Sequence, residues 1–181
     1  MKLGKDVIIH DDVEIRDKNA IMGSHVAIDK GFYCTTKLNL GDYVHISAYV
    51  TCIGSLDGLF VAKGFNNIMA GSRIICKSDN FDDSGLHGAL IPKELLGNKI
   101  SKPVVMDTFS NIGSNAVILP GARLRMGVLL TAGSVLMGDT EEWGIYKGNP
   151  ATLTRKIDGS KIIESAKKLG WIEKEKHNEK H

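Results

Sequence analysis

The chain has 181 residues, of which 43% are apolar, and it carries a formal net charge of +2. This charge is too small to indicate nucleic acid binding, and the length fits one domain with a short appendage. No apolar segment is long enough to be a signal peptide or to span a bilayer. The cysteines Cys34, Cys52 and Cys76 form no paired motif, so we expect buried free thiols in a cytoplasmic protein with no membrane insertion.

Residues 1–21 show an imperfect six-residue repeat, which becomes regular over 22–52 and again over 106–136. In both stretches every sixth residue is apolar, and the residue four places later is apolar or small. The sixth-residue positions are Met22, Ile28, Cys34, Leu40, Ile46 and Cys52, then Met106, Ile112, Ile118, Leu124, Leu130 and Leu136. No ordinary helix or strand has this period, whereas one short strand and one corner per hexad build a three-sided coil. The sequence therefore predicts a parallel β-helix that buries one apolar column.

Two segments interrupt the repeat. A glycine-rich bulge occupies 53–58, after which the register returns at Ala62, with Ser72 and Ser78 expected to point inward. The longer segment, 79–103, contains polar turn residues and two prolines. A loop of this length within a compact repeat is usually functional or an interface element, so we expect an excursion from one corner of the coil.

The repeat is followed by a turn, a helix and a tail. Residues 148–150, Gly-Asn-Pro, predict a tight turn. A helix then begins with Asp158 or Ser160 as its cap and ends at Gly170. Its expected apolar face consists of Ile162, Ile163, Ala166 and Leu169. The predicted organisation is a β-helix domain over 1–157, a C-terminal helix over 158–172 and a frayed tail over 173–181.

Several segments carry a resemblance to a known family. The stretch IGSNAVILPGARLRMGVLLTAGSVLMGDTEEWGIYKGNPATLTRKI, with its closing Gly-x-Pro-Ala turn and basic follower, resembles the end of a hexapeptide-repeat acyltransferase domain. LGDYVHISAYVTCIG, SDNF and LIPKELL are similar to sugar acyltransferases of bacterial surface-polysaccharide pathways, which act on galactosides or on nucleotide-linked 4-amino-4,6-dideoxy sugars. The resemblance spans roughly residues 7–157. It implies a left-handed β-helix, a homotrimer and acetyl-CoA bound between neighbouring prisms, none of which follows from the hexad spacing.

Acyl transfer from a thioester needs a base for the acceptor, and histidine is the natural base near neutral pH. Of the six histidines, His10 and His25 belong to the irregular first coils, and His177 and His181 belong to the tail. His45 lies between two inward residues, so its ring should point outward from a middle coil. It also matches the histidine of the HIS triplet in the similar sugar acyltransferases. The alternative is a surface histidine that bonds a neighbouring turn.

The excursion supplies the remaining candidates. In related enzymes this loop contributes to a site shared with the next subunit, which makes His87 a second catalytic candidate; its alternative is an ordinary loop histidine. Asn80 stands close to the place of the usual catalytic histidine, and Asp79 orients an imidazole, binds a sugar hydroxyl or forms a turn. We expect His45 to be the base in preference to His87, and Asp79 and Asn80 to bind substrate.

Acetyl-CoA is expected along the upper coils, where small residues let the pantetheine arm lie close to the backbone. The small residues are Gly113, Ser114, Ala132 and Gly133. Trp143 either packs against the cofactor or pins the last coil. Lys147 and Arg155 flank the closing turn and either meet the CoA phosphates or remain solvated surface charges.

We therefore expect an acetyl-CoA-dependent acyltransferase that acts on the amino group of a nucleotide-linked amino-deoxy sugar in lipopolysaccharide or other surface-polysaccharide synthesis. An amine asks less of the base than a hydroxyl does, which suits a chain whose usual histidine is displaced. A saccharide hydroxyl is the alternative acceptor, and a non-catalytic β-helix scaffold is the alternative of another class. The zinc hydratases that share this architecture need three converging histidines, so we expect no metal.

Overall fold

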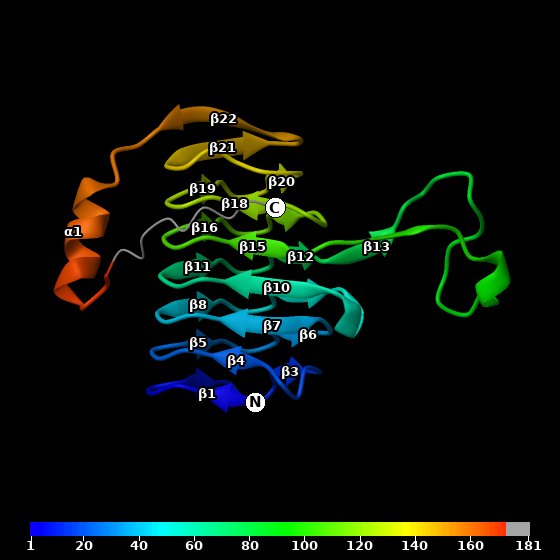
Figure 1. The fold of residues 1–181 in the computed structure, drawn as a ribbon, viewed down its shortest axis with the longest axis horizontal. Helices are drawn as coiled ribbons and strands as arrows, with labels where there is room; N and C mark the ends of the chain where they lie inside the picture. Colours follow the sequence, from blue (N-terminus) through cyan, green and yellow to red (C-terminus); the bar gives the residue numbers. More distant parts are fainter. Residues whose placement is uncertain (173–181) are drawn as a thin grey trace.

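The computed structural model describes residues 1–172, in which short strands stack into a three-sided prism (Figure 1). The first face consists of β1 (Lys2–Leu3), β4 (Ile21–Met22), β7 (Lys37–Leu40), β10 (Leu59–Ala62), β15 (Val104–Met106) and β18 (Arg123–Leu124). The second consists of β2 (Ile8–Ile9), β5 (Ala27–Ile28), β8 (Val44–Ile46), β11 (Asn66–Ile68), β16 (Asn111–Ile112), β19 (Leu129–Leu130), β21 (Gly144–Gly148) and β22 (Ala151–Lys156). The third consists of β3 (Glu14–Ile15), β6 (Tyr33–Cys34), β9 (Thr51–Ile53), β12 (Arg73–Ile75), β17 (Val117–Ile118) and β20 (Val135–Leu136).

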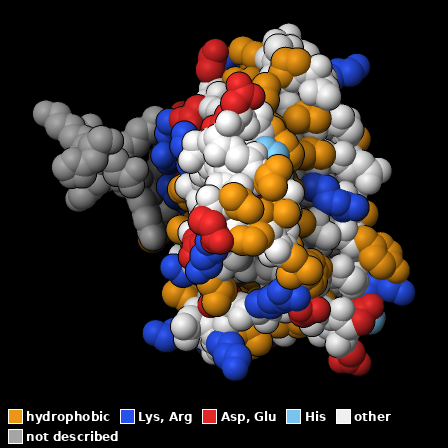
Figure 2. All heavy atoms as spheres, turned by 90° about the vertical axis from the view of Figure 1, so that its right-hand side faces the viewer, with side chains coloured by type: hydrophobic (Ala, Val, Ile, Leu, Met, Phe, Trp, Pro, Cys, Tyr) orange, Lys and Arg blue, Asp and Glu red, His pale blue; other side chains and the backbone are white. Residues whose placement is uncertain are grey.

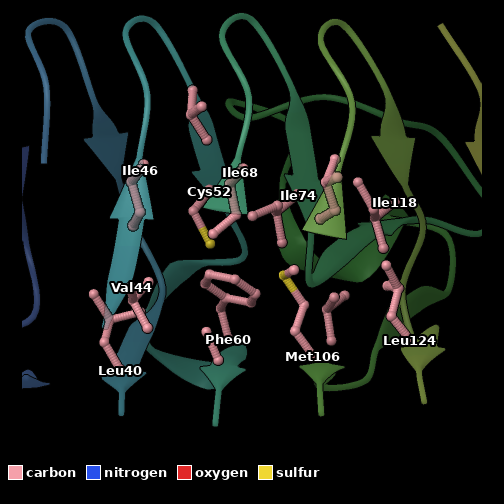
Figure 3. Packing of buried hydrophobic residues seen from close by; sticks show 14 of the residues in the cluster. Leu40, Val44, Ile46, Cys52, Phe60, Ile68, Ile74, Met106, Ile118 and Leu124 are labelled. Atoms are coloured by element: carbon pink, nitrogen blue, oxygen red, sulfur yellow. The ribbon is translucent and has the colours of Figure 1, made fainter. Parts of the chain in front are cut away.

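The predicted apolar column fills the prism (Figure 3). All twelve sixth-residue positions are at most 2% exposed, and Ile74 and Ile118 lie in register on neighbouring strands of the third face. The residues four places later, Ser110 and Ser134 among them, are buried as well. The parallel β-helix expected from the spacing is therefore confirmed, because each coil repeats the same inward direction at the same hexad position.

Polar side chains inside the column are satisfied by the backbone of adjacent coils. The Ser72 hydroxyl donates to the carbonyls of Met69 and Gly113, and the Asn66 amide donates to the carbonyls of Asp107 and Ser110. Each of these bonds removes the penalty of burying an unpaired polar group. They also link coils on either side of the excursion, so the prism continues through the interruption.

The excursion is a hairpin arm that projects from the corner between the third and first faces (Figure 1). The antiparallel strands β13 (Lys77–Asp79) and β14 (Lys99–Ser101) form its stem, and the short helix η2 (Lys93–Leu95) lies near its tip. The prediction that Ser78 points into the prism is wrong. Ser78 is half-buried in the stem and pairs with Ile100, because β14 draws the chain out of the coil from Lys77 onward.

Apolar side chains of the arm are exposed. Leu90 is 97% exposed and Phe81 is 75% exposed. Figure 2 views the molecule from this side and shows apolar and charged side chains mixed over the surface. The bulge after Cys52 is smaller and forms one turn of 3-10 helix, η1 (Ser55–Asp57), before β10 restores the register.

The top of the prism closes with a hairpin and a helix. Gly148, at a φ of 105°, allows the predicted tight turn, so that β22 runs antiparallel to β21. The helix α1 (Ser160–Lys168) follows, and the chain leaves it at Gly170 with a φ of 84°. The Asp158 carboxylate accepts a hydrogen bond from the Ser160 backbone amide at the start of the helix. The predicted tail, 173–181, lies outside the described residues.

The apolar face expected for the C-terminal helix is only partly buried in α1. Ala166 is buried, but Ile162 is 41% exposed and Leu169 is 58% exposed, because a hollow separates them from the second face. None of the helices within residues 1–172 has the length and apolar character needed to cross a bilayer.

Candidate functional site

His45 lies at the centre of β8, on the outer side of the second face. Val44 and Ile46 point into the prism, and strand alternation then places the imidazole outside. Its neighbours in register are Ala27 on β5 and Asn67 on β11. The strand is hydrogen-bonded on both sides, so the backbone that carries the imidazole is held in a fixed position.

Asp29, which follows β5, faces the His45 imidazole. The distance between His45 Nε2 and Asp29 Oδ2 is 3.0 Å. When Nε2 carries the proton that it donates to Asp29, Nδ1 keeps a lone pair and can accept a proton. The two side chains are 43% and 47% exposed, so acceptor molecules can reach them. This is the arrangement of a general base with an orienting carboxylate.

A hollow of about 630 Å³ lies beside His45, between the second face and α1. Its walls come from one edge of the prism, from the outer side of the second face and from the helix. The lining residues are Tyr43, His45, Phe65, Asn66, Asn67, Phe109, Asn111, Lys161, Ile162, Ser165, Ala166 and Leu169. Most of this lining is apolar, and the polar groups concentrate on the strand side.

The prism edge beside the hollow carries a column of rings, which we call the aromatic corner: His25, Tyr43, Phe65, Phe109 and Trp143. Centroids of His25 and Tyr43 are 4.6 Å apart, as are those of Tyr43 and Phe65, with interplanar angles of 19° and 20°. All five residues have φ between 52° and 66°. Bulky residues rarely adopt this left-handed conformation, so stacking must offset a strained backbone at each coil.

The helix α1 is tied to the aromatic corner at both ends. Before the helix, Gly159 packs on the Trp143 ring so closely that a Cβ there would lie 2.2 Å from a ring atom. After the helix, the Trp171 ring meets the Phe109 ring edge-on, with centroids 5.0 Å apart. These two contacts hold α1 along the prism but leave its middle away from the strands.

The arm holds the other predicted residues, and its polar groups bond mainly to one another. Asp82 accepts hydrogen bonds from Ser84, Asn80 and Asn98, which hold the pKa of this carboxyl well below its usual range. Asp79 lies 4.0 Å from the Lys99 ammonium. These contacts order the base of the arm around Asn80.

His87 lies within the same arm, with its ring 5.0 Å from that of Phe81. Its Nδ1 is enclosed and has no hydrogen-bond partner among the described residues. Within residues 1–172, no carboxylate orients this imidazole in the way that Asp29 orients His45.

The structure separates His45 from the residues of the arm. The hollow and α1 lie along one side of the prism, and the arm projects from the other (Figure 1). Asp79, Asn80 and His87 therefore form one group, and His45 belongs to another within a single chain. A site that uses both groups needs a second copy of the chain.

The four small residues predicted to contact CoA come together at the corner between the second and third faces. Gly113 follows β16 and sits directly below Ala132, and the Gly133 amide donates to the Ser114 carbonyl at 2.9 Å. The Gly113 amide is likewise used within the coil. Within residues 1–172 the Ser114 and Ala132 amides have no protein partner, so two of the four can bind an external acceptor.

The three larger residues predicted to contact CoA lie at the top of the prism. Trp143 is half-buried, stacks toward Phe109 and covers Gly127, where a Cβ would lie 2.1 Å from the indole. These contacts fit a residue that pins the last coil. Lys147 and Arg155 are exposed on the β21–β22 hairpin.

Several residues of the hollow were missed in the sequence. Asp29 pairs with a histidine 16 positions away, a separation that the hexad pattern does not single out. The aromatic corner did leave a signal, because Tyr43 follows His25 by one coil of three hexads. Lys161 depends on where α1 packs, which no local pattern indicates.

No family model matches the chain. Among curated proteins, it is 26% identical over 177 residues to dTDP-4-amino-4,6-dideoxy-D-glucose acyltransferase from Escherichia coli, a match that covers 91% of this chain and 85% of that protein. It is also 37% identical over 60 residues to a probable macrolide acetyltransferase from Lysinibacillus sphaericus, covering 33% of each chain.

Among solved structures, AntD, an N-acyltransferase from Bacillus cereus in complex with dTDP and 3-hydroxybutyryl-CoA, is 26% identical with a TM-score of 0.85. The match covers 92% of this chain and 88% of AntD. A hexapeptide-repeat acetyltransferase from Vibrio cholerae, with a TM-score of 0.62 and 19% identity, shares the fold alone. The expected resemblance to hexapeptide-repeat acyltransferases, and with it the enzyme class, is confirmed.

Proposed function

We propose that this protein transfers an acyl group from acyl-CoA to the amino group of a nucleotide-linked amino-deoxy sugar, with His45 as the general base. One observation carries the proposal. The chain matches AntD, solved with dTDP and an acyl-CoA, over nearly its whole length, and it places a histidine–carboxylate pair at the rim of an open hollow.

His45 and Asp29 supply the proton transfer. Asp29 accepts a hydrogen bond from the Nε2–H group and fixes the ring, so that Nδ1 faces the acceptor with a free lone pair. Nδ1 removes one proton from the amine as the amine nitrogen bonds to the acyl carbon. That proton then passes to the departing sulfur as the carbon–sulfur bond breaks. Bound acyl-CoA would supply the thioester.

The unused amides of Ser114 and Ala132 would bind the carbonyls of the pantetheine arm. They lie at the edge of the face that carries His45, because β16 is two strands above β8 in the same sheet. Two strand spacings correspond to about 10 Å, which a pantetheine chain can span. Lys147 is exposed beside the turn of the β21–β22 hairpin, above this corner, and Arg155 is exposed farther along the hairpin, opposite Ile145; both would meet the CoA phosphates.

The arm would complete the site in a homotrimer. Asp79, Asn80 and His87 lie on the side of the prism away from His45, so they can reach a His45 hollow only in a neighbouring copy. The exposed apolar residues of the arm, such as Phe81 and Leu90, would be covered by that contact. Light scattering coupled to gel filtration should give three times the mass of one chain; a monomer that retains full activity would contradict the shared site.

We place the reaction in the cytoplasm and in surface-polysaccharide synthesis. The three cysteines are buried and unpaired, and burial raises the pKa of the Cys52 thiol, as expected for structural thiols in a reducing compartment. The assignment to surface-polysaccharide synthesis rests on the acceptor and would fall with it.

Turnover of acyl-CoA against a panel of acceptors tests the proposal. The panel contains dTDP- and UDP-linked 3-amino and 4-amino sugars and simple galactosides, each with acetyl-CoA and with 3-hydroxybutyryl-CoA. We expect CoA release with a nucleotide-linked amino sugar and a product that gains one acyl group. The histidine–carboxylate pair also suits a hydroxyl acceptor. Turnover of galactosides alone would establish that alternative, and CoA release with no acceptor in the panel would overturn the proposal.

A further inference from the structure

We infer that the hollow between α1 and the aromatic corner binds the pyrimidine base of the nucleotide sugar. The choice of ligand rests on the proposed function. The position, however, comes from three features of this chain: aromatic rings that line the hollow, an under-satisfied amide on its floor, and a helix held away from the strands.

The aromatic corner lines the hollow with aromatic rings. Tyr43 and Phe65 are half-buried, stack on each other at 4.6 Å and line the hollow. Their backbones remain in the left-handed conformation, which is costly for residues of this size. Neighbouring rings of the column cover the faces of Tyr43 and Phe65, so a planar base would meet the ring edges in the hollow, in the edge-to-face arrangement that aromatic pairs also favour.

Asn67 supplies the hydrogen-bonding groups. Its Oδ1 is shielded from water and has no partner in the part of the chain that the structure describes, while its Nδ2 has only the weak acceptor Sδ of Met69, at 3.3 Å. Leaving an amide oxygen buried and unpaired is costly. The terminal torsion of asparagine is soft, so a small rotation lets the amide face a ligand. The amide oxygen then accepts a hydrogen bond from the ring N–H of thymine or uracil, and the amide NH₂ group donates one to the adjacent carbonyl.

The helix keeps the hollow open. The side chains of Ile162, Ala166 and Leu169 line its outer wall, yet Gly159 and Trp171 tie α1 to rings above and below. An apolar hollow of about 630 Å³ would otherwise tend to close. Lys161 lines the hollow and carries a positive charge, so it would face the diphosphate. His45 at the rim would then face the sugar.

Binding of dTDP, UDP, ADP and CoA, measured by calorimetry, tests this assignment. Tyr43→Ala and Asn67→Leu should each weaken dTDP and UDP binding roughly 5- to 100-fold and leave CoA binding unchanged. Tyr43→Phe keeps the ring and should bind dTDP nearly as the wild type does. Tyr49→Ala is the matched control. It changes an exposed tyrosine with a φ of 58° at the next corner of the same coil, outside the hollow, and should leave dTDP binding unchanged.

Equal dTDP affinity in the wild type and in folded Tyr43→Ala and Asn67→Leu proteins would overturn the assignment, as would ADP binding as tightly as dTDP. Circular dichroism establishes folding, and Tyr43→Phe serves if Tyr43→Ala is unstable. Failure of the proposed function gives a different result. If dTDP binding depends on Tyr43 but no acyl group is transferred to any amino sugar, the base site stands and the proposed reaction falls.

Discussion

The two candidate histidines lie on structures of opposite character. His45 is on a strand paired on both sides, with Asp29 at 3.0 Å and an open hollow beside it. His87 is on an exposed arm, where its ring meets Phe81 and no carboxylate. A base must be held in one orientation at a place that the substrate can enter. Of these two candidates, His45 meets both conditions within residues 1–172.

Replacing His45 should give the largest effect. His45→Ala should lower kcat for acyl transfer by roughly 10²- to 10⁴-fold, because the transition state loses its proton acceptor, with little change in the KM for acyl-CoA. His87→Ala is the comparison and should keep kcat within about tenfold of the wild type, since its ring lacks an orienting carboxylate. Steady-state kinetics with dTDP-4-amino-4,6-dideoxyglucose measures both. A large loss in His87→Ala with full activity in His45→Ala would reverse the assignment.

The prism and the arm should also differ in their contribution to stability. Ile118→Ala removes a fully buried side chain between Ile74 and Leu136 and should cost about 2–5 kcal/mol of unfolding free energy. Glu94→Ala changes an exposed polar side chain of the arm and should change the unfolding free energy by less than about 0.5 kcal/mol. Urea titrations compare the two midpoints. Equal losses would show that the arm is part of the cooperative core.

Replacing Asp29 should lower kcat less than replacing His45 does. Asp29→Asn replaces the charged acceptor and should lower kcat about 10- to 100-fold, the effect expected from weakening one hydrogen bond to a charged group. Asp29→Glu should restore part of the activity, because a carboxylate can again reach Nε2, whereas a merely structural role would give no such rescue. Unchanged kcat in Asp29→Asn would show that His45 acts without this partner.

Lowering the pH below 3.8 should destabilise the arm before it destabilises the prism. Hydrogen bonds from Ser84 and Asn80 depress the pKa of Asp82 below its ordinary value of 3.8. A depressed carboxyl pKa stabilises the folded arm at pH values above 3.8, and this contribution is lost as pH falls below 3.8 toward the folded pKa. The protection of residues 80–98 against hydrogen exchange, measured relative to the intrinsic exchange rate at each pH, should therefore fall in this range, while amides of the middle coils stay protected. Asp82→Asn should remove most of this pH dependence; persistence of the full effect would assign it to another group.

The prism could be predicted because the residues that specify each coil lie close together in the sequence. Each hexad specifies its own inward residue, and Ile112, Ile118 and Leu124 repeat the same environment one strand apart. Ser78 was misplaced for a non-local reason, since pairing of β13 with β14 depends on residues more than 20 positions away. The residue at which the chain leaves the repeat therefore depends on the strand with which the chain pairs outside the prism.

The hollow could be predicted only in part. The outward direction of His45 follows from the register, but its pairing with Asp29 depends on how two coils align, and the wall formed by α1 depends on the Gly159–Trp143 and Trp171–Phe109 contacts. Apolar spacing predicted one apolar face on α1, and in the structure Ile162 and Leu169 of that face border an open space. An amphipathic pattern indicates that the apolar face of a helix lies next to another apolar surface. The wall of a ligand site provides such a surface, as a packed core does.

A crystal structure of the wild-type protein with dTDP and CoA tests the central claim most directly. The account predicts the pyrimidine ring between α1 and the rings of Tyr43 and Phe65, the distal phosphate pointing toward His45, and the CoA thiol approaching the same imidazole. A nucleotide bound elsewhere on the chain, with His45 facing neither ligand, would contradict it.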